Sequence, residues 1–322
     1  MQLLFGIQGL RQLPPAAVVS IGNFDGVHWG HRSIVAMVQR LAGEAPGRAV
    51  AAVTFEPHPV TVLRPEAAPP RLTPVGVKRE LLAALGIQFL VELPPEPAVL
   101  NLSAEDFWRI LRDEVRPSHI VEGDSFNFGK GRGGNVRQLQ KWAVGSGIGV
   151  HIGTAAEVGL LDMQRVPVSS SLVRFLLAHG RVRDAAICLG RAYELRGPVI
   201  VGHQRGRTIG IPTANLDCSA QLVPADGVYV GRCRVDGRVW PAAVSIGPMP
   251  TFGDNRRQVE AHLVGYEGDL YGREIGVELV DWLREQRKFD GVESLKTQLG
   301  RDIEWTVSRS ALDPARPIAR MA

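Results

Sequence analysis

The sequence predicts an α/β protein in which an N-terminal domain with a parallel sheet is followed by a small antiparallel β-barrel with a closing helix. Up to about residue 185, short apolar strands alternate with amphipathic helices, as in parallel sheets covered on both faces. After about residue 195, short β-rich runs are separated by Gly, Asp and Pro, which favours a barrel. We therefore expect domains over residues 1–184 and 185–310 and a disordered tail over 311–322.

In the first domain, we expect strands at the apolar runs and helices where the apolar residues have helical periodicity. The strands cover 16–21, 49–55, 89–93, 119–121 and 149–152, and the helices cover 32–41, 77–85, 104–115 and 136–143. Ligands of such sheets bind beyond the carboxyl ends of the strands. Loops that directly follow a strand are therefore the first places to search for site residues.

In the second domain, the β-rich runs cover 198–201, 227–235, 238–245, 259–265 and 274–280, and the closing helix covers 292–301. The stretch 170–193 has a helical pattern, so we expect a short helical connection between the domains. The proline-rich stretches 65–74 and 94–97 are predicted to be surface loops.

The composition is that of an ordinary globular protein, with 37 basic and 33 acidic side chains in 322 residues and a pI of about 9.2. The basic residues form no stripe interleaved with aromatics, so we expect no nucleic-acid partner. The sequence offers neither a signal-peptide pattern nor an apolar run of the ~18 residues that span a membrane, so we expect no membrane partner. Three cysteines without C-x-x-C spacing indicate a cytoplasmic location. A homo-oligomer is left open.

The loop after the first of these strands carries His28 and His31 in the pattern H-x-G-H, with Gly30 between them. Glycine lets a ligand approach the backbone closely at the start of the following helix. Helix-end N–H groups attract anions, and two imidazoles can donate to charge that develops on a transferring phosphate. The alternative is a pair of histidines with a structural role in the loop, because short motifs also match by chance.

The string 20–31 resembles the nucleotidyltransferases that transfer a nucleoside monophosphate from a triphosphate. Within it, residues 22–28 resemble the FMN adenylyltransferase module of bacterial bifunctional riboflavin kinase/FAD synthetases. The resemblance implies a Rossmann-like nucleotidyltransferase domain with His28 and His31 as catalytic residues. It also assigns ATP or phosphate binding to Gly22, Asn23, Phe24 and Gly30.

A loop after the second of the predicted strands resembles part of the flavin and ATP cleft of that family. It has the sequence F-E-P-H-P, and the resemblance assigns flavin binding to Pro57, His58 and Pro59. The alternative is a rigid proline turn with a histidine on the surface.

A second segment, G-D-S-F-N-F-G, resembles part of the FMN site and implies flavin contacts at Ser125, Phe126 and Phe128. Two aromatics at a spacing of two are also typical of core positions. Ser125 and Asn127 depart from the family, which commonly has Asp or Asn at the first position and often Arg at the second.

A serine cluster at 169–171 begins a predicted helix and resembles the I-S-S-S-x-x-R segment that binds the triphosphate in the superfamily. The resemblance assigns this role to Ser169, Ser170, Ser171 and Arg174. A serine cap leaves backbone N–H groups pointing at an incoming anion, and a guanidinium one turn later could reach a phosphate oxygen. The alternative is a capped helix with a surface arginine.

The string 202–216 resembles the nucleotide-binding segment of riboflavin kinases. By this resemblance ATP phosphates bind at Gly202, Arg205, Gly206, Arg207 and Gly210. The following P-T-A-N sequence supplies Thr213 and Asn215 as ligands of Mg²⁺, and their oxygen atoms are the hard donors that this ion prefers. The pattern G-x-x-x-x-G-K-[ST] is absent, so the kinase would not be of the P-loop type.

In the same family, the glutamate of E-x-H-L acts as general base on the ribityl hydroxyl of riboflavin, and Glu260 is the matching residue. A lone glutamate in a strand is otherwise a solvated side chain. Arg284 and Arg287 match the flavin side of the kinase. Ser245 departs from the family, which commonly has Asn there.

The resemblance covers residues from about 15 to 305 and implies one enzyme with two activities. The barrel would phosphorylate riboflavin to FMN with Mg²⁺ as cofactor, and the first domain would adenylylate FMN to FAD. ATP would be the co-substrate in both steps. The implied binding partners are riboflavin, FMN, FAD and ATP. A cytidylyltransferase-like or pantetheine-phosphate-type transferase would leave the barrel without a role. A flavin-binding regulatory protein with one inactive site is the alternative outside the enzymes.

Overall fold

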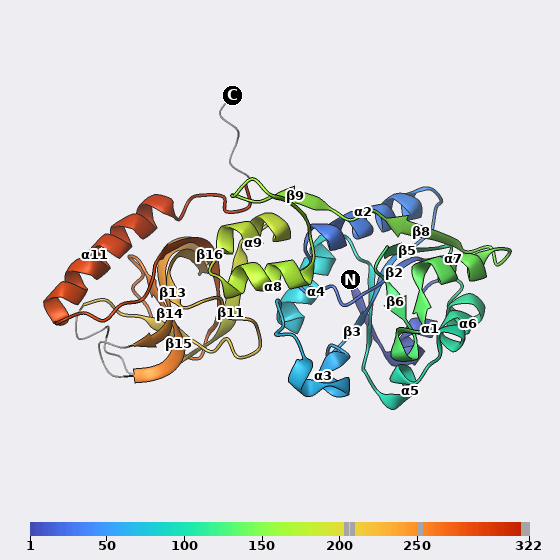
Figure 1. Ribbon diagram of the computed structural model, residues 1–322, viewed down its shortest axis with the longest axis horizontal. Helices are drawn as coiled ribbons and strands as arrows, with labels where there is room; N and C mark the ends of the chain where they lie inside the picture. The colour runs from blue at the N-terminus through green and yellow to red at the C-terminus, as the bar shows by residue number, and fades with distance from the viewer. Residues whose placement is uncertain (203–205, 207–209, 250–253, 317–322) are drawn as a thin grey trace, which may run out of the picture. The chain divides into compact units, whose positions relative to one another are not determined.

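The computed structural model describes residues 1–202, 206, 210–249 and 254–316. Its contacts divide the chain into two compact units (Figure 1). The first unit is Met1–Pro69 with Val75–Glu157, and the second is Pro70–Pro74 with Val158–Ala322. The expected boundary between an adenylyltransferase domain (1–184) and a kinase domain (185–310) stays a prediction.

The first unit is built on a six-stranded sheet in the order β1-β4-β3-β2-β5-β8, in which each neighbouring pair is parallel. Its strands are β1 (Gln2–Phe5), β2 (Val18–Ile21), β3 (Val50–Phe55), β4 (Phe89–Leu93), β5 (His119–Gly123) and β8 (Gly149–Gly153). The predicted parallel sheet is confirmed. One strand was not predicted from the sequence: β1 is four residues long and lies at one edge of the sheet.

Helices cover both faces of this sheet. They are α1 (Gly6–Arg11), α2 (Trp29–Gly43), α3 (Val60–Leu63), α4 (Val75–Ala84), α5 (Pro97–Leu100), α6 (Ala104–Arg109) and α7 (Val136–Ala143), with the short 3₁₀-helices η1 (Pro65–Ala67) and η3 (Lys130–Arg132) and the π-helix η2 (Ile110–Val115). A small hairpin joins β6 (Asn127–Phe128) and β7 (Gly134–Asn135). On one face, Val38 of α2 and Leu82 of α4 belong to one buried cluster; on the other, Leu10, Phe107 and Leu139 belong to a second. The alternation of apolar side chains along the strands supplies both clusters.

The second unit contains a closed barrel in the order β11-β12-β15-β14-β13-β16. Its strands are β11 (Tyr193–Ile200), β12 (Ala214–Leu216), β13 (Gly227–Val235), β14 (Arg238–Met249), β15 (Asp254–Leu263) and β16 (Glu274–Arg284). All neighbouring pairs are antiparallel, which confirms the predicted barrel. The closing helix α11 (Val292–Arg309) packs against β13 and β14 and is longer than the predicted 292–301.

The chain reaches the barrel through the hairpin β9 (Glu157–Gly159) and β10 (Arg165–Pro167), followed by α8 (Ser170–Ala178) and α9 (Val182–Leu189). The helical connection predicted over 170–193 is therefore confirmed. Leu176 and Leu177 of α8 and Val182 of α9 belong to the same buried cluster as the barrel interior. The second core thus extends over the connecting helices.

The prediction of a surface loop over 65–74 is wrong for its last part. Leu72 is 0% exposed and Thr73 is 5% exposed, and Leu72 belongs to the core of the second unit. The carbonyl of Pro70 accepts a bond from Arg174 Nε (2.7 Å), and that of Arg71 accepts one from the backbone N–H of Leu222 (2.6 Å). Prolines interrupt regular elements, but their presence does not exclude burial of the residues between them.

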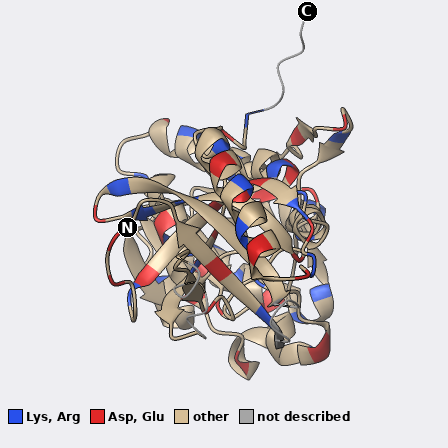
Figure 2. Cartoon of the chain, turned by 90° about the vertical axis from the view of Figure 1, so that its left-hand side faces the viewer, with Lys and Arg blue, Asp and Glu red and all other residues tan. Residues whose placement is uncertain are grey.

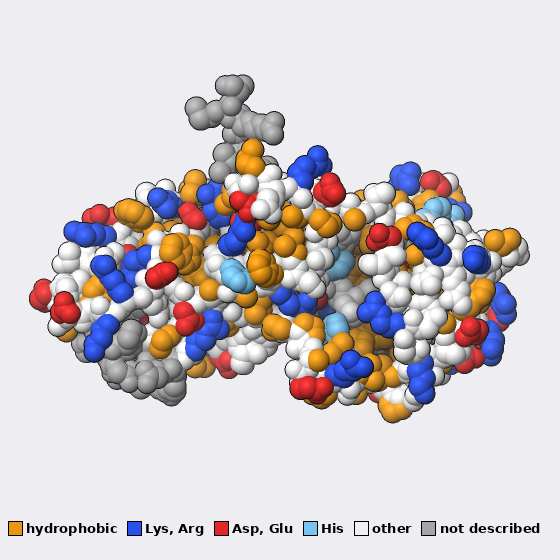
Figure 3. All heavy atoms as spheres, in the orientation of Figure 1, with side chains coloured by type: hydrophobic (Ala, Val, Ile, Leu, Met, Phe, Trp, Pro, Cys, Tyr) orange, Lys and Arg blue, Asp and Glu red, His pale blue; other side chains and the backbone are white. Residues whose placement is uncertain are grey.

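The three cysteines are free, and all lie in the second unit: Cys188, Cys218 and Cys233 are 0%, 3% and 0% exposed. Residues 311–316 form turns, and the rest of the expected tail lies outside the described residues. None of the described helices is both long and apolar enough to cross a bilayer. Acidic and basic side chains are interspersed over the faces drawn in Figures 2 and 3.

Candidate functional site

The loop that leads to His28 and His31 follows β2, the strand at which the connections between strands of the parallel sheet change direction. β2 lies between β3 and β5; the chain runs from β2 to β3 on one side, and β5 and β8 lie on the other. β2 and β5 pair through Val18 and Val19, and farther along the strand the N–H of Ile21 donates to the Glu122 carboxyl (2.6 Å). Open α/β sheets bind ligands at such a switch point.

Two buried side chains anchor this loop, which spans residues 22–28. Phe24 and Val27 are each 1% exposed, with φ angles of 48° and 42°, in the left-handed region that L-residues rarely adopt. Phe24 therefore serves as an anchor, and its assignment to phosphate binding stays a prediction, as do those of Gly22 and Gly30.

His28 and His31 lie together at the start of α2. His28 is the N-cap residue and is 5% exposed, and His31 lies in the first turn. Their rings stack with centroids 3.8 Å apart and planes at 19°, and Phe24 packs against His31 at 5.3 Å. Both imidazoles thus lie at the N-terminal end of a 15-residue helix, the end that attracts anions.

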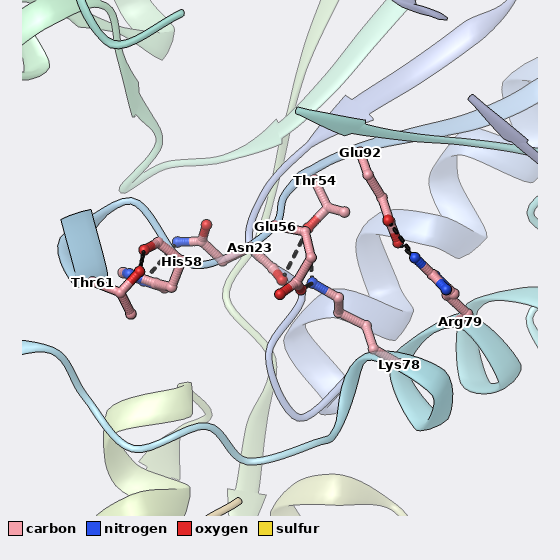
Figure 4. A network of polar contacts seen from close by, with 8 residues as sticks. All are labelled: Asn23, Thr54, Glu56, His58, Thr61, Lys78, Arg79 and Glu92. Atoms are coloured by element: carbon pink, nitrogen blue, oxygen red, sulfur yellow. Dashed lines mark hydrogen bonds and ion pairs between the residues drawn. The ribbon is translucent and has the colours of Figure 1, made fainter. Parts of the chain in front are cut away.

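The F-E-P-H-P loop follows β3, next to the histidine loop (Figure 4). The Asn23 amide lies 3.0 Å from Nε2 of His58, and the backbone N–H of Val60 donates to Nδ1 of the same ring (3.2 Å). The structure thus brings together Asn23 and His58, which the sequence assigns to ATP and to flavin. Pro57 and Pro59 flank His58 in the loop before α3.

The aromatic segment after β5 is partly core. Phe128 is 8% exposed and packs against Phe107 and Trp142, with ring centroids 5.9 and 6.2 Å away. Phe126 is half-buried and stacks on Phe128 at 5.5 Å. Ser125 is exposed, and its carbonyl accepts a bond from Nδ2 of Asn127 (2.7 Å). The flavin contacts assigned to Ser125, Phe126 and Phe128 stay predictions.

The serine cluster belongs to the second compact unit, whereas His28 and His31 belong to the first. Ser169 caps α8 by accepting a bond from the N–H of Leu172 (3.2 Å), as the sequence predicts. Ser170 and Ser171 form the first turn. Arg174 donates from Nε to the Pro70 carbonyl, so at least one of its N–H groups is used within its own unit. Triphosphate binding by these four residues stays a prediction.

On the barrel, three residues predicted for the kinase are adjacent. Asn215 of β12 lies directly opposite Glu260 of β15, and Ala214 opposite Ala261. Because side chains alternate along a strand, buried Ala214 and Ala261 point inward, and Thr213, Asn215 and Glu260 share the other face. The hydroxyl of Thr213 donates to Oε2 of Glu260 (3.4 Å). Three oxygen-bearing side chains therefore meet at one place, and such donors fit Mg²⁺.

Glycine at two positions leaves room beside this group of side chains. A Cβ on Gly202 would lie 2.3 Å from Nδ2 of Asn215, and one on Gly206 would lie 2.2 Å from the carbonyl oxygen of Ile211. Gly210 has a φ of +82°. Arg205 and Arg207, also assigned to ATP, lie outside the described residues. A groove of about 720 Å³ opens beside Gly202 and Asn215, within the size range of small-molecule sites.

The two arginines assigned to the flavin contact α11. Arg284 forms an ion pair with Asp302 (2.7 Å), which is 3% exposed, and Arg287 donates to Gln298 (2.6 Å). Both guanidinium groups lie near the ring of Phe289, at 5.8 and 4.9 Å from its centre. These contacts fasten the helix to the barrel; flavin binding by either arginine stays a prediction.

Three ionisable residues near the histidine loop, Lys78, Glu56 and Glu122, were not predicted from the sequence as part of a site. Lys78 is 5% exposed and pairs with Glu56 at 2.9 Å. It lies four residues before the buried Leu82 on α4, and a charge within an apolar helical stripe could have drawn attention to it. Glu122 is 2% exposed, and burial raises its pKa well above the usual value, against the N–H of Ile21, which lowers it.

Among the described residues, no three His, Cys, Asp or Glu side chains gather as a metal cluster.

Two family models match the chain. The FAD synthetase model matches residues 10–172, and the riboflavin kinase model matches residues 189–309. Relatives named bifunctional riboflavin kinase/FMN adenylyltransferase match over nearly the whole chain. One from Pseudomonas fluorescens is 37% identical, over 94% of this chain and 96% of its own; one from Escherichia coli K12 is 35% identical with the same coverage. One from Bacillus subtilis is 33% identical over 91% and 92%.

A solved structure from Streptococcus pneumoniae, described as a macrolide-efflux protein, has the same fold. It is 27% identical, covers 96% of this chain and 100% of its own, and has a TM-score of 0.83.

Proposed function

The chain belongs to the bifunctional riboflavin kinase/FMN adenylyltransferases, and from this premise we propose which of its residues carry each reaction. The enzyme phosphorylates riboflavin to FMN and then adenylylates FMN to FAD, with ATP as substrate in both steps. Nothing favours a flavin-binding regulator with one inactive site. The observation that carries the residue assignment is the meeting of Thr213, Asn215 and Glu260 on one face of the barrel.

We assign riboflavin phosphorylation to this group of side chains. Glu260 takes the proton from the ribityl hydroxyl as its oxygen attacks the γ-phosphorus of ATP, and ADP leaves. Thr213 and Asn215 would hold Mg²⁺, which when bound neutralises charge on the phosphates. Gly202, Gly206 and Gly210 let the backbone approach the phosphates, and the groove beside Asn215 would hold a substrate.

We assign adenylyl transfer to the loops at the switch point of the parallel sheet. A phosphate oxygen of FMN attacks the α-phosphorus of ATP, the bond to the β-phosphate breaks, and pyrophosphate leaves. His28 and His31 donate hydrogen bonds to the charge that develops in this step. His58 faces Asn23 across the two loops, which supports a flavin site next to the nucleotide site.

The test is a reciprocal pair of variants in the full chain, supplied with riboflavin, ATP and Mg²⁺ and analysed for FMN and FAD. In His31→Ala, FMN should accumulate while FAD formation falls, because loss of one such donor costs about 2.7–4 kcal/mol of transition-state stabilisation. In Glu260→Gln, riboflavin phosphorylation should fall by about 10² to 10⁴ while added FMN is still adenylylated. Comparable loss of both steps in either variant would contradict the assignment of separate sites.

Omission of Mg²⁺ from this assay tests the proposed ion. Phosphorylation should stop without it and recover when it is added back, because the phosphate charge is otherwise left uncompensated. We also propose a cytoplasmic location, which the three free thiols support.

A further inference from the structure

A continuous chain of polar contacts joins α4 to both loops of the proposed adenylyl-transfer site (Figure 4). Nζ of Lys78 donates to Glu56 Oε2 (2.9 Å) and to Thr54 Oγ1 (3.3 Å). The same Thr54 hydroxyl donates to the backbone carbonyl of Asn23 (3.2 Å), and the Asn23 amide meets His58. One ammonium group thus reaches the loop after β3 through Glu56 and the loop after β2 through Thr54.

The polar side chains in this series of contacts are buried, and their burial costs free energy of desolvation. Lys78 is 5% exposed, Thr54 is 0% exposed, and the side chain of Glu56 is 14% exposed. Desolvation of a buried ion pair offsets much of its attraction, and apolar residues of similar size often give equal or better stability. Stability alone therefore does not account for a lysine at this position.

The hydrogen bonds of His58 define which of its two ring nitrogens carries the proton. Nδ1 of His58 accepts a bond from the Val60 N–H, so a neutral ring carries its proton on Nε2. Nε2 lies 3.0 Å from Nδ2 of Asn23; because both nitrogens would then carry hydrogen, exchange of the amide nitrogen and oxygen makes this contact a hydrogen bond from Nε2 to Oδ1 of Asn23.

We propose that Lys78 is a positioning residue for adenylyl transfer: through Thr54 and Glu56 it holds the loops that carry Asn23 and His58 at a fixed separation. This inference rests on the proposed assignment of those loops to the nucleotide and the flavin. Lys78 acts through its neighbours and has no part in the chemical step.

The neighbouring residue on α4 provides a matched control. Arg79 also pairs with a buried carboxylate, that of Glu92, through bonds of 2.8 and 2.6 Å. Glu92 lies opposite Thr54 in the β3–β4 pair, so the two ion pairs are close in space. The hydrogen bonds of Arg79 go to β4, however, and reach neither loop.

The experiment compares Lys78→Met, Arg79→Met, Thr54→Val and Thr54→Ser in the full chain. For each, kcat and KM for FMN and for ATP are measured in adenylyl transfer, well below the unfolding temperature. Riboflavin phosphorylation in the same preparation reports the active protein concentration. Lys78→Met and Thr54→Val should lower kcat/KM for adenylyl transfer by about 10- to 10²-fold, as small misplacements of reacting groups do. Arg79→Met should leave it unchanged, and phosphorylation should be unchanged in all four.

The two Thr54 variants separate positioning from packing and do not depend on the folding of Lys78→Met. Valine keeps the volume and loses the hydroxyl, whereas serine keeps the hydroxyl and loses a methyl group. Positioning requires that serine retains adenylyl transfer and valine loses it. Equal losses, or wild-type transfer in Thr54→Val, would overturn the proposal. His28→Ala in the same series tests the underlying site: if it abolishes transfer while Thr54→Val does not, only the role of Lys78 is wrong; if it does not, the site assignment itself fails.

Discussion

Truncation of Leu72 to alanine should destabilise the unit that contains the barrel, although the sequence places Leu72 within the first predicted domain. Leu72 is 0% exposed and belongs to the barrel core. Leu→Ala changes in cores cost about 2–5 kcal/mol, and the cost is largest where the surroundings cannot close over the cavity. Here the flanking carbonyls of Pro70 and Arg71 are both hydrogen-bonded, which limits such closure.

The loss of free energy of unfolding corresponds to a lower midpoint temperature of thermal unfolding. A loss of about 3.5 kcal/mol, at about 3 °C for each kcal/mol in a unit of this size, lowers the midpoint by about 10 °C. Riboflavin phosphorylation that survives a fixed heating time reports this unit, because Thr213, Asn215 and Glu260 all belong to it. Calorimetry of the same samples gives the unfolding transition directly.

Leu82→Ala is the matched control. Leu82 is also 0% exposed, but it lies in a core of the first unit. The same substitution there should lower the heat resistance of adenylyl transfer and leave that of phosphorylation near the wild-type value. If Leu72→Ala does not lower the phosphorylation midpoint more than Leu82→Ala does, the segment does not contribute to the barrel core as described.

Two further predictions concern single groups. Because burial raises the pKa of Glu122, the folded protein binds that proton more tightly than the unfolded chain; its contribution to the free energy of unfolding is full below about pH 4.3 and is lost as the pH rises toward the folded-state pKa. Denaturant titrations should therefore show wild type losing stability relative to Glu122→Gln by up to about 1.4 kcal/mol per pH unit in that range, and parallel curves would refute the assignment. Gly202→Ala should reduce riboflavin phosphorylation but not adenylylation of added FMN, because a Cβ would lie 2.3 Å from the Asn215 amide; activity assays of both steps decide this, and normal phosphorylation would contradict it.

Much of the architecture follows from local sequence patterns. Strands of the parallel sheet appear as apolar runs because they are buried on both faces, as Val18 and Val19 illustrate by facing opposite cores. The barrel runs are also recognisable, but β12 was hidden: two of its three residues lie inside the P-T-A-N sequence, and its strand character comes from pairing with β11 and β15. Short strands of this kind depend on tertiary contacts that a local pattern does not contain.

The sequence motifs predicted candidate residues for the site, but not the side chains that hold those residues in place. Glu260 is far in sequence from Thr213 and Asn215, and their meeting required the register of two strands. Leu72 was assigned to a loop because its neighbours are prolines, and Lys78 went unnoticed because its partners Glu56 and Thr54 lie on another element. Both depend on contacts between distant segments, which composition and periodicity do not encode.

The distribution of cysteines gives the molecule a built-in probe of barrel opening. All three thiols are buried in the second unit, and burial raises the pKa of Cys188 and Cys218 to about 12 and that of Cys233 to about 11. In the closed protein near neutral pH, both shielding and the scarcity of thiolate suppress alkylation. A reagent such as iodoacetamide would therefore label only molecules whose barrel unit has opened, where the thiols regain an ordinary pKa near 8.5. The alkylation rate of the native protein therefore reports how often the second unit opens. No engineered label is needed, and the first unit, which has no cysteine, does not contribute.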